Sequence, residues 1–249
     1  MGLFMKGLIL AAGKGARMKG IYYNKCLGVV NKKSLVSHGI ERLLLMRILD
    51  IVIVIGKDGD SIKEHVEVYQ QHAKISFIEQ KIQLGIVDAI KCAVPIIGTD
   101  DFVLCLGDEI FYNQKPVEML GYFFSSEADC ICGIVPNEND EEIKKCYTVH
   151  IDDDNNIIEL DEKPERPFNN FKGTGFCIFR NRMLKHIGEV SPNSKSGQYD
   201  LCDWITICIG KGLICKVFDF AEKEFNVNTF EDLQQANDFL SSSDRRVNK

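Results

Sequence analysis

The sequence predicts a three-layer α/β/α fold on a mostly parallel sheet, with a strand-rich insertion in its second half. Short apolar stretches rich in β-branched residues, such as DIVIVIG at 50–56 and FVLCLG at 102–107, alternate with amphipathic stretches of helical spacing through the first half. Apolar strands without polar alternation are buried on both faces, which is typical of a parallel sheet covered by helices. Shorter strands then follow one another without intervening helices, which indicates the insertion.

The alternation can be followed in chain order. In the first half we expect strands at 8–13, 50–56, 75–80 and 102–111, and helices at 34–46, 60–72, 85–97 and 116–126. In the second half we expect strands at 128–136, 147–151, 157–164, 173–179 and 213–220, and helices at 199–212 and 231–243. The polar run DDDNN between two of these strands predicts a turn.

No long linker, repeat or low-complexity segment divides the chain. We therefore expect one domain over residues 1–249. Within it, residues of about 1–125 form the part with the strand and helix alternation, and residues of about 126–240 form the part with the insertion.

Composition excludes several classes of protein. A formal net charge of -6, from 30 Lys and Arg against 36 Asp and Glu, argues against a nucleic-acid partner held by phosphate charge. The apolar runs are too short to span a bilayer, so no membrane association is expected. Ten cysteines in a chain without a signal-peptide pattern predict reduced thiols and a cytoplasmic location. The five histidines form no catalytic or metal motif, and we expect them to be structural or exposed.

The stretch KGLILAAGKGARMKG near the N-terminus predicts a strand that ends in a phosphate-binding loop. A dinucleotide fingerprint would need glycine at position 18, where Met18 stands. A Walker A loop that begins at Gly15 would need Lys and Ser or Thr after Gly20, and the chain has Ile21 and Tyr22. What remains is a glycine turn whose backbone N–H groups can approach phosphate. A plain strand-to-helix turn fits these glycines equally well.

The rest of the chain favours a phosphate-binding loop over a plain strand-to-helix turn. LAAGKGARM resembles the opening loop of the sugar-phosphate nucleotidylyltransferase family, and NKCLGVVNKKSLVSH matches the family stretch that places a signature lysine at Lys25. QKIQLGIVDAI resembles the base-reading segment, FVLCLGDEIF the strand that ends in a metal-binding aspartate, and DEKP the acceptor-binding motif. GTGFCIF and EFNVNTFEDLQQAN match the last two motifs, so the resemblance covers nearly the whole chain.

The resemblance implies a Rossmann-like, nucleotide-diphospho-sugar transferase-like fold and a magnesium-dependent enzyme. Such an enzyme transfers a nucleoside monophosphate from an NTP to a phosphorylated acceptor in sugar nucleotide biosynthesis, as for cell-surface polysaccharide, and a homodimer is compatible with it. The implied residues are Arg17 and Lys25 for catalysis; Leu10, Ala11, Ala12, Gly13, Gly15, Gln80 and Gly85 for the nucleotide; Glu162, Lys163 and Gly175 for the acceptor; and Asp108 with Asn228 for Mg²⁺.

The chemistry agrees with these residue types. Two anions must approach while charge builds on the leaving pyrophosphate, so cations and a metal must offset it. An arginine can bind pyrophosphate in a bidentate way, and a lysine supplies a compact charge. Magnesium takes one or two carboxylates plus substrate phosphates. With Asn228 in place of a common second aspartate, we expect a weaker metal site.

Three substitutions depart from the family pattern. Asn24 and Cys26 replace the prolines that flank the signature lysine, and Asn31-Lys32 replaces a glycine pair. We expect a pyrimidine NTP (CTP, dTTP or UTP) and a sugar 1-phosphate acceptor. A cytidylyltransferase for a non-sugar acceptor (phosphoglutamine, phosphocholine or aminoethylphosphonate) is the alternative. A non-catalytic nucleotide-sugar-binding regulatory protein is the alternative from another class.

Overall fold

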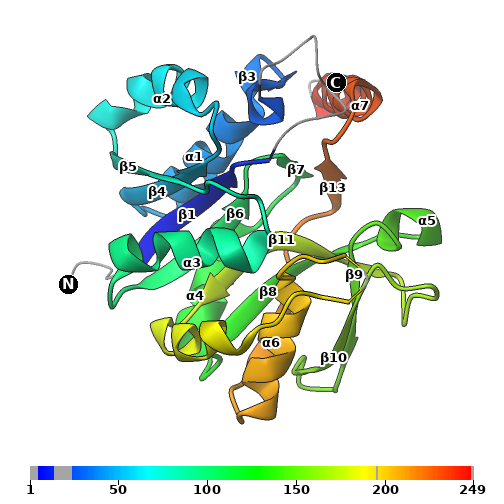
Figure 1. Ribbon diagram of the computed structural model, residues 1–249. Helices are drawn as coiled ribbons and strands as arrows, with labels where there is room; N and C mark the ends of the chain where they lie inside the picture. The colour runs from blue at the N-terminus through cyan, green and yellow to red at the C-terminus, as the bar shows by residue number, and fades with distance from the viewer. Residues whose placement is uncertain (1–4, 14–23, 195, 248–249) are drawn as a thin grey trace.

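A seven-stranded sheet crosses the computed structural model, which describes residues 5–13, 24–194 and 196–247 (Figure 1). The order across the sheet is β12 (Cys215–Asp219), β8 (Cys130–Pro136), β11 (Phe171–Phe179), β6 (Asp101–Leu106), β1 (Met5–Ala11), β4 (Asp50–Ile55) and β5 (Lys74–Glu79). Strands β6, β1, β4 and β5 are parallel neighbours, and β12 is parallel to β8. Strand β11 runs antiparallel to both of its neighbours, so the predicted mostly parallel sheet is confirmed.

Helices cover both faces of the sheet, which confirms the three layers. On one face α3 (Ile86–Ile97), η4 (Asn181–Glu189) and α6 (Leu201–Gly210) pack on the sheet. On the other face lie α1 (Leu35–Leu45), α2 (Asp60–Val66) with η3 (Glu67–Gln71), and α4 (Pro116–Ser125). Successive strand side chains point to opposite faces, so Leu8 of β1 joins the first core and Ile9 joins the second.

The second half of the chain adds three strands to the same sheet and a smaller annex beside it. A hairpin of β9 (Tyr147–Ile151) and β10 (Ile157–Glu162) follows the short α5 (Asp140–Ile143). The predicted turn between them is present, because Asp152 Oδ1 accepts hydrogen bonds from the backbone N–H groups of Asp154 and Asn156.

The strand expected at 102–111 is two strands, and this corrects the prediction. Strand β6 ends at Leu106, and β7 (Glu109–Tyr112) leaves the main sheet to pair with β13 (Lys223–Asn226). The break falls at Gly107, whose N–H donates to Leu10 O at 2.9 Å. Because the chain turns here, Asp108 lies at the carboxyl edge of the sheet.

The substituted glycine pair closes a hairpin of β2 (Val29–Val30) and β3 (Lys33–Ser34). Asn31 and Lys32 both have positive φ, at 47° and 66°, which is the conformation that favours glycine in a tight hairpin. The C-terminal α7 (Phe230–Val247) secures this turn. Asn237 on α7 accepts from Asn31 N and donates to Val29 O, which explains why the hairpin forms without glycine.

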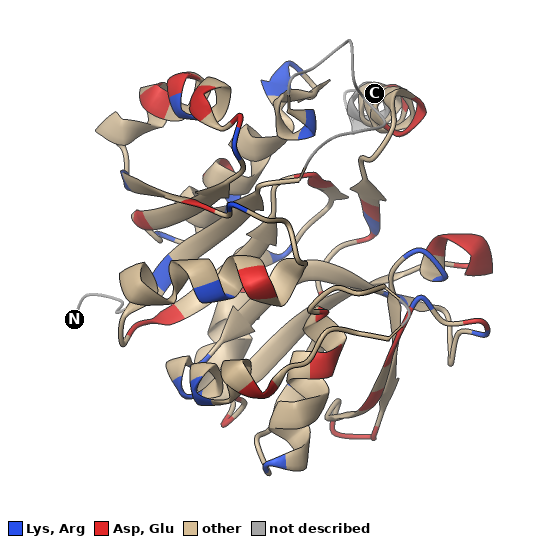
Figure 2. Cartoon of the chain, viewed as in Figure 1, with Lys and Arg blue, Asp and Glu red and all other residues tan. Residues whose placement is uncertain are grey.

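Acidic and basic residues are interspersed over the elements seen in Figure 2, without a basic face in that view. Within the described part of the chain, no helix combines the length and the apolar character needed to cross a membrane. All ten cysteines are free, as the sequence predicts.

Candidate active site

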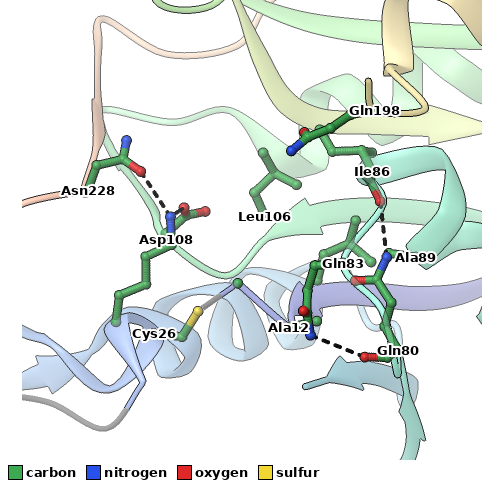
Figure 3. Close-up of a pocket in the computed structure, with 14 residues that line it drawn as sticks. Ala12, Cys26, Gln80, Gln83, Ile86, Ala89, Leu106, Asp108, Gln198 and Asn228 are labelled. Carbon is green, nitrogen blue, oxygen red and sulfur yellow. Dashed lines mark hydrogen bonds and ion pairs between the residues drawn. The ribbon is translucent and has the colours of Figure 1, made fainter. Parts of the chain in front are cut away.

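A pocket of about 560 Å³ opens at the carboxyl edge of the sheet, where β1 and β6 end. Figure 3 shows Asp108 and Asn228 at one end and Gln80, Gln83 and Ile86 at the other, with Leu106 and Ala12 between them. The lining residues are Leu10, Ala12, Gly13, Lys25, Cys26, Gln80, Gln83, Gly85, Ile86, Ala89, Leu106, Asp108, Gln198 and Asn228. Crevices at the carboxyl edge of such sheets are the usual place for ligands.

The charged end of the pocket joins three distant parts of the sequence. Lys25 Nζ forms an ion pair with Asp108 and donates a hydrogen bond to Asn228 Oδ1 at 3.0 Å. Asn226 fixes the orientation of Asn228, because its Oδ1 accepts from Asn228 Nδ2 at 2.8 Å. Two side-chain oxygens and one ammonium therefore meet at a single point of the pocket.

Asn24 positions Lys25. It caps the 3-10 turn η2 (Lys25–Leu27) by accepting from Cys26 N at 2.9 Å, and its Nδ2 donates to Ala11 O at 3.1 Å. The side chain is 5% exposed. The amide thus ties the lysine segment to the end of β1, so the missing proline is replaced by two buried hydrogen bonds.

A buried ionic cluster lies behind Asp108. Glu109 of β7 accepts from the N–H of Gly175 on β11 at 2.8 Å, and Lys172 of β11 forms an ion pair with Glu224 of β13. Burial, with the nearby carboxylates of Glu224 and Asp108, raises the pKa of Glu109 well above its usual range. Burial lowers the pKa of Lys172, but Glu224 outweighs this and leaves it raised. The cluster joins the strands that carry Asp108 and Asn228.

The far end of the pocket is built on the loop that precedes α3. Gly85 has φ of 111°, and a Cβ there would lie 2.7 Å from Tyr199 O, so only glycine fits. Tyr199 N donates to Leu84 O and Tyr199 O accepts from Val87 N. These bonds bring Gln198 into the pocket, a residue that the motifs did not single out.

Glu162 and Lys163 lie in a separate cavity of about 180 Å³, together with Asn193, Ser196, Asp200, Cys202 and Asp203. Burial raises the pKa of Glu162 to about 7, although Lys163 and a hydrogen bond from Cys202 oppose the shift. The segment 196–203 borders both cavities, because Gln198 lines the first and Asp200 the second.

The structure thus gathers Leu10, Ala12, Gly13, Lys25, Gln80, Gly85, Asp108 and Asn228 in one pocket and puts Glu162 and Lys163 in the neighbouring one. Ala11 is buried beside this pocket, and Gly175 lies behind it. Arg17 and Gly15 lie outside the described residues, so their assignment stays a prediction. Gln83, Ile86, Leu106 and Gln198 were not foreseen. Gln83, Ile86 and Leu106 lie within recognised motifs, which is the signal that could have found them, whereas Gln198 lies in none of these motifs.

Histidine and cysteine are two kinds of side chain that could act as reactive groups in the pocket. No histidine lines the pocket among the residues described there. Cys26 does line it, but burial and the Asp108 carboxylate raise the pKa of its thiol to about 12. A thiol in that state is a poor nucleophile at neutral pH.

This geometry defines an α/β protein with a pocket at the carboxyl edge of its sheet, and comparison with known proteins defines its family. A sequence profile described as nucleotidyl transferase matches residues 6–243, so the chain belongs to the nucleotidyl transferase family. Transfer of a nucleotidyl group is the reaction class of that family.

The chain has low sequence identity to its named relatives, but the alignments cover most of its length. The chain is 28% identical to a UTP–glucose-1-phosphate uridylyltransferase of Haloferax volcanii, over 84% of this chain and 85% of the relative. It is 25% identical to a glucose-1-phosphate thymidylyltransferase of Neisseria meningitidis, over 96% and 83%. Other relatives are longer, and the chain spans 58% of a low-salt glycan biosynthesis nucleotidyltransferase of H. volcanii.

A solved structure supports the fold. The UDP-glucose pyrophosphorylase complexed with UDP-glucose superposes with a TM-score of 0.85 at 19% identity, over 96% of this chain and 99% of that one. At this identity the likeness confirms the predicted fold class alone.

Asn24 gives a testable consequence of this geometry. We expect Asn24→Ala to lower the free energy of unfolding by about 1–3 kcal/mol, since it removes a cap and leaves Ala11 O buried without its donor. Turnover should fall as well, because Lys25 loses its anchor. Urea unfolding and pyrophosphate release measure the two effects. Asn139→Ala removes the exposed cap of α5 and serves as the control, with unchanged turnover. Wild-type stability of Asn24→Ala would contradict the assignment.

Proposed function

We propose that this protein transfers the nucleoside monophosphate of UTP or dTTP to a sugar 1-phosphate and releases pyrophosphate. One observation carries the proposal: a single pocket holds Lys25, Asp108 and Asn228 at one end and Gln80 with Gly85 at the other. The first group suits phosphates, and the second suits a base. The names of the uridylyl and thymidylyl relatives support the choice of substrates.

In this reaction a phosphate oxygen of the acceptor attacks the α-phosphorus. The new O–P bond forms as the bond to the bridging oxygen of pyrophosphate breaks. A phosphate monoester is largely ionised at neutral pH, so the attack needs no general base. The described lining of the pocket agrees with this, because it contains no histidine.

The task of the protein is therefore to offset negative charge. Asn24 holds Lys25 at the carboxyl end of β1. There the lysine is within reach of a phosphate that enters between Gly13 and Asp108. Its ammonium exchanges part of its interaction with Asp108 for one with the α-phosphate. Preorganised charge of this kind acts strongly in a partly buried site. Arg17, at its predicted position, would bind the pyrophosphate.

The residues present fit a magnesium ion. The Asp108 carboxylate and Asn228 Oδ1 already converge on one cation, the ammonium of Lys25. Among the described residues no group of three or more His, Cys, Asp or Glu side chains could hold a metal. That agrees with an ion that takes one or two protein oxygens and completes its shell with phosphates and water. Bound there, magnesium would neutralise charge on the NTP phosphates, and Lys25 would turn toward the acceptor side.

The acceptor would occupy the cavity beside Glu162 and Lys163, with Lys163 on its phosphate. This cavity also favours a second candidate acceptor, a small phosphorylated amine. Among the described residues that line it, Asp161, Glu162, Asp200 and Asp203 outnumber one cationic side chain, that of Lys163. An amine or quaternary ammonium would offset that excess of negative charge.

A screen of pyrophosphate release tests the proposal. Each NTP is paired with a panel of sugar 1-phosphates, phosphocholine, aminoethylphosphonate and phosphoglutamine. We expect release with UTP or dTTP and a hexose 1-phosphate. Release only with CTP and a phosphorylated amine would move the function to the second candidate. Nucleotide-sugar binding without release for any pair would replace the enzyme with the non-catalytic alternative.

Lys25→Ala tests the charge-offsetting step. We expect kcat/KM to fall by about 100-fold or more, since one electrostatic partner of the transition state is lost, and this loss should far exceed any loss of stability from unpairing Asp108. Lys63→Ala is the matched control, because Lys63 is an exposed lysine on α2 that lies outside both cavities. Equal turnover of the two variants would refute the step.

Because the pKa of Glu162 is raised, we expect acceptor binding to depend on pH. Its pKa lies near 7, so it is a carboxylate at pH 8 and largely protonated at pH 6. A carboxylate accepts a hydrogen bond from the acceptor more strongly, so KM for the acceptor should rise as pH falls from about 8 to 6. Glu162→Gln should flatten that profile, while KM for the NTP stays unchanged in both proteins. A wild-type profile in the Gln variant would contradict the assignment.

The raised pKa of Glu162 also makes the stability of the fold depend on pH. The folded pKa is raised from an ordinary 4.5 to about 7, so the folded state retains a proton that the unfolded state releases. This group therefore lowers the free energy of unfolding as pH rises from about 4.5 to 7. Glu162→Gln should remove that decline in urea unfolding.

A further inference from the structure

The side chain of Gln80 is held in one orientation by two acceptors. Gln80 follows β5 and is 3% exposed. Its Nε2 donates to Asp88 Oδ2 at 2.7 Å and to Gly85 O at 3.2 Å. A carboxylate and a carbonyl can only accept, so the carboxamide cannot turn over without losing both bonds. The bond to Asp88 is charge-assisted and is the stronger of the two.

This orientation decides which atom of Gln80 meets a ligand. Both N–H groups of the carboxamide are directed to the loop and first turn of α3, where Asp88 lies. Figure 3 shows the amide nitrogen of Gln80 turned toward that loop and the oxygen on the other side, toward the pocket that Gln80 lines. The base end of the pocket therefore presents Oε1, an acceptor.

We propose that Asp88 is a positioning residue that locks Gln80 with Oε1 toward the nucleobase, so that the pocket selects a base with a ring N–H. Uracil and thymine carry such an N–H between two carbonyls. Cytosine has a ring nitrogen acceptor in the same place, which would face Oε1 lone pair to lone pair. The beginning of α3 supplies backbone N–H groups for a neighbouring carbonyl of the base. The inference rests on the proposed function and names the basis of its nucleotide choice.

Asp88 is the informative position because it bonds to Gln80 and is not among the residues that line the pocket. Replacing it with Asn gives Gln80 a neighbour that can donate as well as accept. The carboxamide can then present either Oε1 or Nε2 to the pocket. Oε1 can accept from the ring N–H of uracil or thymine, and Nε2 can donate to the ring nitrogen of cytosine. Selectivity between bases falls, although the pocket keeps its shape and its phosphate-binding end.

Titration calorimetry with Mg·UTP and Mg·CTP, without any acceptor, tests the inference independently of turnover. We expect the wild-type protein to bind UTP at least about tenfold more tightly than CTP, since a mismatched polar pair in a buried site is unfavourable. In Asp88→Asn the ratio should fall to about threefold or less. Asp88→Glu keeps a group that only accepts and should retain the wild-type ratio.

The matched control is Asp60→Asn. Asp60 is the acidic residue in the first turn of α2, as Asp88 is in the first turn of α3, but it is exposed and paired with Lys63. Its substitution should leave the ratio unchanged. A probe on the wild-type protein guards against misfolded variants: UTP methylated at N3 cannot donate, and its binding should weaken by at least about tenfold.

The outcomes separate the two proposals. A wild-type ratio in Asp88→Asn, a wild-type protein that binds UTP and CTP equally, or full affinity for the N3-methylated UTP would each overturn the positioning of Gln80 by Asp88. Selective nucleotide binding without pyrophosphate release in the acceptor screen would overturn the proposed function and leave the positioning supported.

Discussion

The proposed reaction depends on one electrostatic constraint, which is that two phosphates must meet at a point where the protein places a cation. Lys25, Asp108 and Asn228 come from three distant parts of the chain and converge at the carboxyl edge of β1 and β6. The parallel sheet makes this convergence possible, because the ends of neighbouring strands lie at the same edge. Everything else near the pocket holds these three side chains in place or shapes the space beside them.

Buried polar groups hold these three side chains in place. Asn24 ties the lysine segment to β1, and the ionic cluster of Glu109, Lys172 and Glu224 joins the strands that carry the aspartate and the asparagine. Buried ion pairs contribute little net stability after desolvation, whereas removing one partner is strongly unfavourable. Their value here is geometric, since they fix β7 and β13 against β11. The same principle operates at the base end, where an acceptor-only neighbour fixes Gln80.

Much of this could be predicted from sequence. Apolar runs such as 50–56 can only be buried strands, and a carboxylate directly after one, Asp108, is hard to explain without a ligand. The break between β6 and β7 has a local signal in Gly107 and Asp108, but the pairing of β7 with β13 could not be predicted, because β13 lies far along the chain. Nor could the contact of Tyr199 with the loop before α3, since nothing local encodes a partner so far along the chain. The role of Asn24 could not be predicted either, because it depends on Ala11 O, which only the fold brings near.

The central claim is a direct displacement at the α-phosphorus, without a covalent intermediate on the protein. The described pocket offers one thiol, Cys26, and burial keeps its pKa near 12. The direct measurement is the stereochemical course with a single diastereomer of an NTP in which one sulfur replaces a non-bridging oxygen and makes the α-phosphorus a stereocentre. A single in-line displacement predicts inversion of configuration at phosphorus in the nucleotide product. Retention would require two displacements and a nucleophilic side chain, and would contradict the account.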